Sequence, residues 1–92
     1  MKNGNYIIKF SKQAENDKKK LKNSGLDKSC KTILNLMKED PFCYPPSYEK
    51  LCGELNGLYS RRINRQHRIV YEIVEDKKEI HIIRMWTHYE KL

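Results

Sequence analysis

The stretch that decides the fold runs from Leu58 to Trp86 and reads LYSRRINRQHRIVYEIVEDKKEIHIIRMW. It contains three runs rich in β-branched and aromatic residues, which are typical of β-strands. Two short polar segments, at residues 64–66 and 76–77, separate these runs and are suited to turns. The pattern predicts an antiparallel meander with strands at Leu58–Ile63, His67–Val74 and Glu79–Trp86.

The N-terminal part of the chain predicts one more strand and a first helix. The apolar run from Asn5 to Phe10 is typical of a strand. Ser11 is suited to cap a charged helix from Lys12 to about Asn23, in which Ala14 and Leu21 are the clearest apolar positions. The lysines of this helix either form a solvated face or contact RNA.

A second helix follows, and it is the clearest helix in the sequence. Ser24 and Asp27 have the spacing of a capping box, and Pro41 should end the helix. The segment 41–57 then carries all three prolines and two glycines, which predicts a long loop of a kind that is often functional. Apolar residues at helical spacing form the predicted buried stripe: Leu26, Cys30, Ile33, Leu34 and Met37.

The element order is therefore βααβββ. We expect an α+β fold in which two N-terminal helices pack on a small antiparallel sheet. With 92 residues, the chain has room for a single domain, residues 1–92, and a domain this small has a thin core.

The chain is strongly basic, with a formal net charge of +7, which favours a polyanionic partner such as nucleic acid. All five arginines lie in the last third, and the arginine fork suits phosphate better than lysine does. No apolar run is long enough for a membrane span or a signal peptide, so we expect a soluble cytoplasmic protein. Three cysteines without a CxxC pair predict free thiols, with no disulfide framework and no zinc site.

The first hairpin of the meander predicts a cationic site. A three-residue loop at 64–66 pairs Arg62 with Arg68, so two guanidinium groups would stand side by side on one face of the sheet. Like charges directly opposed destabilise a sheet, and a phosphate bound between them would resolve the conflict. Two alternatives stay open: the register is shifted, or an acidic residue neutralises the pair, with Glu49, Glu54 and Glu72 as the candidates.

The end of the chain could bring a proton donor to this site. Closing the second hairpin at residues 76–77 sets Arg68 opposite Met85, so His88 and Tyr89 would emerge near the hairpin tip that carries Arg65. Histidine is the common proton donor near neutral pH, although a histidine close to a C-terminus is usually an exposed bystander. His67 and His81 lie within strands and are expected to be structural.

A ribonuclease that works without a metal ion needs a base for the 2′-hydroxyl, cations for the phosphate and an acid for the leaving 5′-oxygen. The loop before the hairpin offers Glu49, beside Lys50, and also Glu54 as candidate bases. Composition alone does not choose between the two glutamates. No phosphate-binding glycine loop, zinc-protease motif or carboxylate cluster for two-metal catalysis is present in the sequence.

Several of these residues occur together in a known pattern. Tyr48-Glu49-Lys50-Leu51, the run Ser60-Arg61-Arg62-Ile63, the run His67–Tyr71 and the closing His88-Tyr89 resemble the YoeB/Txe toxins of the RelE/ParE superfamily. The match is dense over residues 41–74 and at the tail. Cys52 stands where the family has lysine, Tyr59 replaces a tryptophan, and the chain continues past His-Tyr through Glu90-Lys91-Leu92.

The resemblance implies a RelE-like fold and the toxin of a type II toxin–antitoxin pair that cleaves mRNA on the ribosome with no metal or other cofactor. It implies Glu49 as the general base, Arg68 as the phosphate-stabilising arginine and His88 as the general acid. It further implies that Arg62 contacts phosphate and that Tyr89 orients the RNA, and Lys50 could supply the contact missing at Cys52. Arg65, at the hairpin tip, completes the set of expected RNA contacts.

The expected partners are mRNA on the ribosome and an antitoxin whose acidic segment covers the arginine groove, and homodimer formation stays open. Two other functions are alternatives to the hypothesis of an mRNA-cleaving toxin. One is a non-catalytic ParE-like toxin that binds DNA gyrase, and the other is a basic module that binds RNA without cleaving it.

Overall fold

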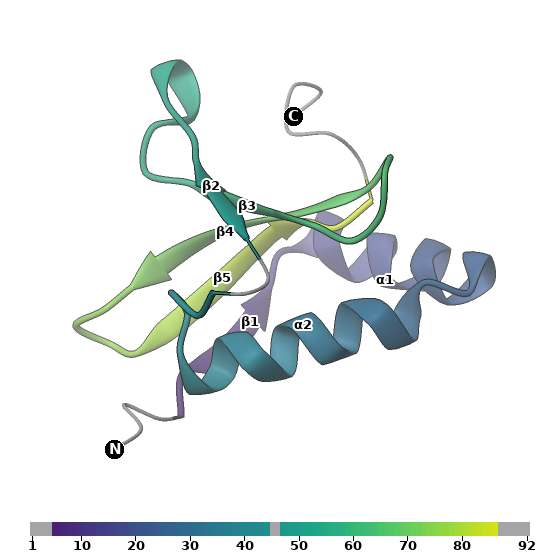
Figure 1. The fold of residues 1–92 in the computed structure, drawn as a ribbon, viewed down its shortest axis with the longest axis horizontal. Helices are drawn as coiled ribbons and strands as arrows, with labels where there is room; N and C mark the ends of the chain where they lie inside the picture. The colour runs from purple at the N-terminus through teal and green to yellow at the C-terminus, as the bar shows by residue number, and fades with distance from the viewer. Residues whose placement is uncertain (1–4, 45–46, 87–92) are drawn as a thin grey trace.

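The computed structural model describes residues 5–44 and 47–86, and its elements follow the predicted order with one strand added (Figure 1). The strands and helices are β1 (Ile7–Phe10), α1 (Lys12–Ser24), α2 (Asp27–Glu39), β2 (Tyr48–Lys50), a short 3₁₀ helix (Gly53–Leu55), β3 (Tyr59–Arg62), β4 (Arg68–Val74) and β5 (Glu79–Arg84). The α+β fold class and the three-strand meander are thus confirmed, each strand within the range that its pattern predicted.

The sheet is mixed rather than purely antiparallel. Its strand order is β1-β5-β4-β3-β2, and β1 runs parallel to β5 while every other neighbouring pair is antiparallel. The added strand β2 forms inside the segment that was expected to be a loop, because Tyr48–Lys50 pairs with the edge of β3. Strand pairing of this kind depends on contacts between distant segments, which local patterns do not reveal.

Both α-helices, α1 and α2, cover the same face of the sheet, and no α-helix of the described part of the chain covers the opposite face (Figure 1). The core lies between these two layers. Its fully buried side chains come from both helices and from β4 and β5, and they include Leu21, Met37, Ile69, Tyr71, Ile80 and Ile82. On the predicted stripe of α2, Cys30, Ile33 and Met37 are buried, while Leu26 and Leu34 pack against the core with partial exposure.

The first helix begins as predicted, but the junction between the helices differs. The Ser11 hydroxyl accepts a hydrogen bond from the Ala14 backbone N–H and caps α1. The predicted capping box of Ser24 with Asp27 is wrong, because Ser24 is still helical and its hydroxyl donates to the Leu21 carbonyl. Gly25 ends α1 at a φ of 81°, a left-handed conformation that glycine adopts without strain.

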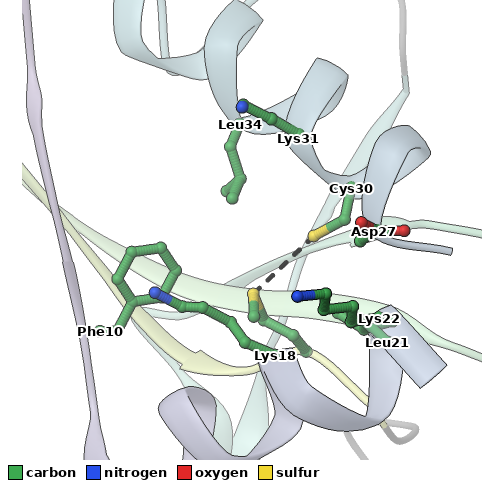
Figure 2. Close-up of a pocket in the computed structure, with 9 residues that line it drawn as sticks. Phe10, Lys18, Leu21, Lys22, Asp27, Cys30, Lys31 and Leu34 are labelled. Carbon is green, nitrogen blue, oxygen red and sulfur yellow. Dashed lines mark hydrogen bonds between the residues drawn. The ribbon is translucent and has the colours of Figure 1, made fainter.

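The two helices and the sheet enclose a pocket of about 330 Å³, shown in Figure 2. Its apolar lining includes Phe10, Leu21, Cys30 and Leu34. It lies on the helix side of the sheet, and none of the predicted site residues that the structure describes lines it. Among the described residues, neither helix is long and apolar enough to cross a bilayer.

Candidate active site on the open face of the sheet

Three neighbouring strands place three of the predicted site residues, Glu49, Arg62 and Arg68, on the sheet face that the helices leave open. Glu49 on β2 lies opposite Ser60 on β3, and Arg62 on β3 lies opposite Arg68 on β4. Because side chains alternate along a strand, these four residues share one face. The intervening β4 residue Ile69 points to the helix side, where it is fully buried. The predicted register of the first hairpin is therefore confirmed.

Glu49 and Arg68 form an ion pair across this face. Arg68 Nη1 donates to Glu49 Oε1 at 3.0 Å and also contacts Ser60 Oγ at 3.3 Å. The side chain of Arg68 is 15% exposed, whereas that of Glu49 is 60% exposed. The arginine is thus held in the sheet surface and the carboxylate is open to solvent, so a ligand can reach the carboxylate directly.

The Glu49–Arg68 ion pair decides between the alternatives for the opposed arginines Arg62 and Arg68. The register is not shifted, and of the three acidic residues considered, Glu49 contacts Arg68. Glu72 instead lies near His81, with 3.6 Å between the Glu72 carboxylate and His81 Nδ1. One of the open alternatives, neutralisation by Glu49, is therefore observed in the free protein, and it brings together two of the predicted catalytic residues.

The other predicted RNA-contacting residues that the structure describes do not all lie on this face. Arg62 is exposed on the same face as Arg68, and Arg65 is exposed in the turn between β3 and β4. Lys50 is exposed as well, but it follows Glu49 on β2 and lies opposite Tyr59. Strand alternation therefore assigns Lys50 to the other face of the sheet, away from the Glu49–Arg68 pair.

Arg61 differs from its neighbours because it is fully buried on the helix side. Its Nε donates to the Tyr71 hydroxyl at 2.9 Å and its Nη2 donates to the Pro41 carbonyl at 2.8 Å. The guanidinium group also lies over the ring of Tyr48, 4.8 Å from the ring centre. Burial is the main reason that the pKa of Tyr71 rises to about 12. Arg61 is therefore a structural residue. Strand alternation places it on the same face as Ile63, and this was the sequence signal for its burial.

The C-terminal strand reaches the site by a route that differs from the prediction. The β4–β5 register shifts by one residue, so that Tyr71 pairs with Ile82 but Val70 pairs with Arg84. The predicted Arg68–Met85 pairing is therefore wrong, and Met85 is buried in the core. A β-bulge adds one residue to one strand, and no local sequence pattern predicted it.

Trp86, the last described residue, nevertheless lies beside the start of β4. Its ring stacks on that of His67 with 4.0 Å between the ring centres, and its backbone carbonyl contacts His67 Nδ1. His67 directly precedes Arg68, so the chain leaves the described region close to the site. His88 and Tyr89 lie outside the described residues, and their predicted roles are not tested by the structure.

A buried carboxylate on α1 fixes this end of β5. Asp17 is 2% exposed, and its Oδ2 accepts from Arg84 Nε at 2.9 Å and from the Met85 backbone N–H at 3.0 Å. Asp17 was not among the residues that the sequence pattern singled out. Its spacing from Ala14 and Leu21, at i+3 and i−4, places it on the buried face of α1 and was the available signal.

The other titratable groups have local partners. His81 Nε2 lies 2.8 Å from the Glu79 carboxylate, and hydrogen bonds from His81 and Lys9 lower the pKa of Glu79. Within residues 5–44 and 47–86, no group of three histidine, cysteine or acidic side chains is arranged to hold a metal ion. The cysteines Cys30, Cys43 and Cys52 are free thiols, as expected.

Comparison with known proteins gives a consistent result. Residues 10–89 match the family described as YoeB-like toxin of bacterial type II toxin-antitoxin system. A Toxin YoeB of Synechocystis sp. is 36% identical over 77 residues, covering 84% of this chain and 80% of that protein. One chain of a YoeB–YefM complex from Staphylococcus aureus superposes on this chain with a TM-score of 0.77 and 32% identity. The alignment covers 94% of this chain and all of that chain. A YoeB dimer from the same organism gives a TM-score of 0.79 at 31% identity, with 94% of this chain and all of that chain covered.

Proposed function

Because this chain belongs to the YoeB-like toxins of bacterial type II toxin–antitoxin systems, we propose that it is an endoribonuclease that cleaves mRNA on the ribosome. The observation that carries this proposal is the Glu49–Arg68 ion pair on the open face of the sheet. It joins a solvent-exposed carboxylate, which can act as a base, to a guanidinium group that can stabilise charge on a phosphate. Both groups come from strands of a packed sheet, which limits their movement.

The proposed reaction is an attack by the RNA's own 2′-hydroxyl on the adjacent phosphorus. Glu49 accepts the hydroxyl proton as the new P–O bond forms. Arg68 stabilises the negative charge on the phosphate oxygens, with Arg62 as a second contact on the same face. The bond to the 5′-oxygen then breaks, and His88 donates a proton to that oxygen. The products are a 2′,3′-cyclic phosphate and a 5′-hydroxyl, and the reaction needs no metal ion.

In the free protein, Arg68 is engaged by Glu49, so RNA binding must exchange this contact. The phosphate replaces the carboxylate as the partner of Arg68, and the carboxylate is released toward the 2′-hydroxyl. One displacement thus prepares both groups for the reaction. The proposed roles of Arg65 and Tyr89 are to contact the RNA on either side of the phosphate, while Lys50 would contact RNA only from the other face of β2.

We propose that the antitoxin inhibits the enzyme by covering the same cations. The similar S. aureus toxin is found in a complex with YefM, and a second structure of it is a dimer. For this chain, an acidic antitoxin segment would compete with RNA for Arg62 and Arg68, and a homodimer is a further form to be measured. A protein that acts on translating ribosomes works in the cytoplasm, which is the proposed location.

The test is to incubate the protein with translating ribosomes and to map new 5′ ends on the mRNA. New ends that carry a 5′-hydroxyl, formed equally with a chelator at concentrations that leave ribosomes intact, would support the proposal. RNA binding without new ends would instead favour a non-cleaving RNA-binding module. Inhibition of gyrase supercoiling without mRNA cleavage would favour a ParE-like activity.

A further inference from the structure

We infer that Ser60 is a positioning residue that holds the Arg68 guanidinium group in the orientation needed to receive the RNA phosphate. This inference rests on the proposed function of the Glu49–Arg68 site. Ser60 does not itself touch the reacting atoms in the proposed mechanism. It acts through Arg68, by way of the 3.3 Å contact between Ser60 Oγ and Arg68 Nη1.

Ser60 occupies the centre of the site. It lies on the middle strand β3, opposite Glu49 on one side and opposite Val70 on the other. Arg68 precedes Val70 by two residues on β4, so Arg68 and Ser60 are diagonal neighbours on one face. To reach Glu49 on β2, the Arg68 side chain must cross β3, and the residue it crosses is Ser60.

The environment of Ser60 gives its hydroxyl a defined partner. Ser60 is 1% exposed, so its hydroxyl is removed from bulk water, and a buried hydroxyl needs a hydrogen-bond partner. Hydrogen bonds that involve a charged group are stronger than neutral ones. Arg68 is the cation that this hydroxyl contacts, and the same Arg68 nitrogen also reaches Glu49.

The two partners of this Arg68 nitrogen differ in their exposure to solvent. Glu49 is 60% exposed and must release Arg68 when RNA binds, whereas Ser60 is buried and can remain in place. The serine contact therefore keeps the guanidinium group oriented during the exchange from carboxylate to phosphate. Preorganised donors of this kind contribute to the transition state without reorganisation at the moment of reaction.

The size of Ser60 matters as well as its hydroxyl. The Arg68 side chain passes over this position, so a long side chain here would block the path to Glu49. Serine combines a small side chain with a hydrogen-bond acceptor. Threonine is the only other residue with a hydroxyl on a side chain of nearly this size. Valine has the shape of threonine without the hydroxyl, which provides a matched pair of variants.

The experiment compares Ser60→Thr, Ser60→Val and Ser60→Ala for mRNA cleavage on ribosomes. We expect Ser60→Thr to keep kcat within about threefold of the wild-type value. Ser60→Val and Ser60→Ala should lower kcat by roughly tenfold to a hundredfold, the equivalent of one hydrogen bond to a charged group, with KM nearly unchanged. Ser29→Ala, at an exposed position of α2, is the control and should change neither constant.

A second measurement is independent of cleavage. Hydrogen exchange at the Arg68 guanidinium group, followed by NMR in the free protein, should be faster in Ser60→Val and Ser60→Ala than in the wild type and Ser60→Thr. If Ser60→Val has wild-type kcat and wild-type exchange at Arg68, the inference is wrong. If the wild type cleaves no mRNA but the exchange rates follow the expected order, the proposed function fails while the positioning of Arg68 by Ser60 stands.

Discussion

Arg61 and Arg62 are neighbours in the sequence, yet their side chains lie on opposite faces of the sheet and in opposite environments. Arg61 is fully buried and donates to the Tyr71 hydroxyl and the Pro41 carbonyl. Arg62 is exposed opposite Arg68 on the face that carries the proposed active site. The alternation of a β-strand thus separates a structural arginine from one available to a ligand.

The two arginines should respond differently to truncation. Arg61→Ala should lower the free energy of unfolding by about 3 kcal/mol, because it leaves the Tyr71 hydroxyl and the Pro41 carbonyl without this donor and opens a cavity. Arg62→Ala should change it by less than about 0.5 kcal/mol, as is usual for a surface residue. Urea unfolding followed by circular dichroism measures both values. Equal destabilisation by the two variants would contradict the structural assignment.

The buried carboxylate of Asp17 should also be important for stability. Asp17→Ala leaves Arg84, whose side chain is 18% exposed, without its ion-pair partner and should cost about 3–5 kcal/mol. Asp17→Asn, which keeps one acceptor oxygen, should cost less. The exposed ion pair of Glu15 with Lys18 on the same helix provides the control. Glu15→Ala should cost less than about 1 kcal/mol. Thermal unfolding of the three variants would show whether this order holds.

The proposed catalytic groups should affect rate rather than folding. His88→Ala should slow mRNA cleavage by roughly 10²- to 10⁴-fold, the range for one positioned proton donor. Arg68→Ala should cost roughly 10²- to 10³-fold or more, since it removes a donor aimed at the transition state. Glu49→Gln keeps the shape but loses the base. Glu49 lies on a strand rather than a loop, but β2 is held by backbone pairing, so the fold should be retained.

His67 and His81 provide the matched controls for His88. The ring of His67 stacks on Trp86, and His81 pairs with Glu79, so both rings already have structural partners in the free protein. His67→Ala and His81→Ala should change the unfolding midpoint more than the cleavage rate. Full cleavage activity in His88→Ala or Glu49→Gln would overturn the assigned roles.

Cys30 should make stability depend on pH in the alkaline range. Burial, helped by the nearby charge of Asp27, raises the pKa of the Cys30 thiol from 9.0 to about 11. Between these values the folded protein retains a proton that the unfolded chain has lost, so the free energy of unfolding falls as the pH rises through this window. From pH 8 to 10.5 the fall should be about 2 kcal/mol greater in the wild type than in Cys30→Ala. Equal slopes in urea titrations of the two proteins would contradict this prediction.

RNA binding should weaken steeply as salt is added. If Arg62, Arg65 and Arg68 each neutralise one phosphate of a single strand, a fourfold rise in monovalent salt should weaken binding by roughly 20-fold. The proposed acidic antitoxin segment should compete for the same cations and show a similar dependence. Fluorescence anisotropy with a labelled RNA whose 2′-hydroxyl is blocked at the cleavage site measures binding without turnover. An affinity that barely changes with salt would exclude these three contacts.

Local sequence patterns determined both helices, four of the five strands and one register. Alternation and a three-residue loop were enough to predict that Arg62 lies opposite Arg68, because a short hairpin leaves few ways to pair its strands. The apolar spacing of α2 likewise predicted which side chains meet the core, since a helix buries one stripe. The match of residues 10–89 to a toxin family was anticipated from the arginine-rich hairpin and the neighbouring motifs.

Only the tertiary structure decided how distant segments meet. The parallel pairing of β1 with β5, the strand formed by Tyr48–Lys50 and the shifted register at Val70 all depend on contacts across the whole sheet. The contact of Glu49 with Arg68 belongs to the same class, because it exists only when β2 joins the edge of β3. A local pattern specifies which face a side chain occupies, but the partner on that face is selected by the packing free energy of the complete fold.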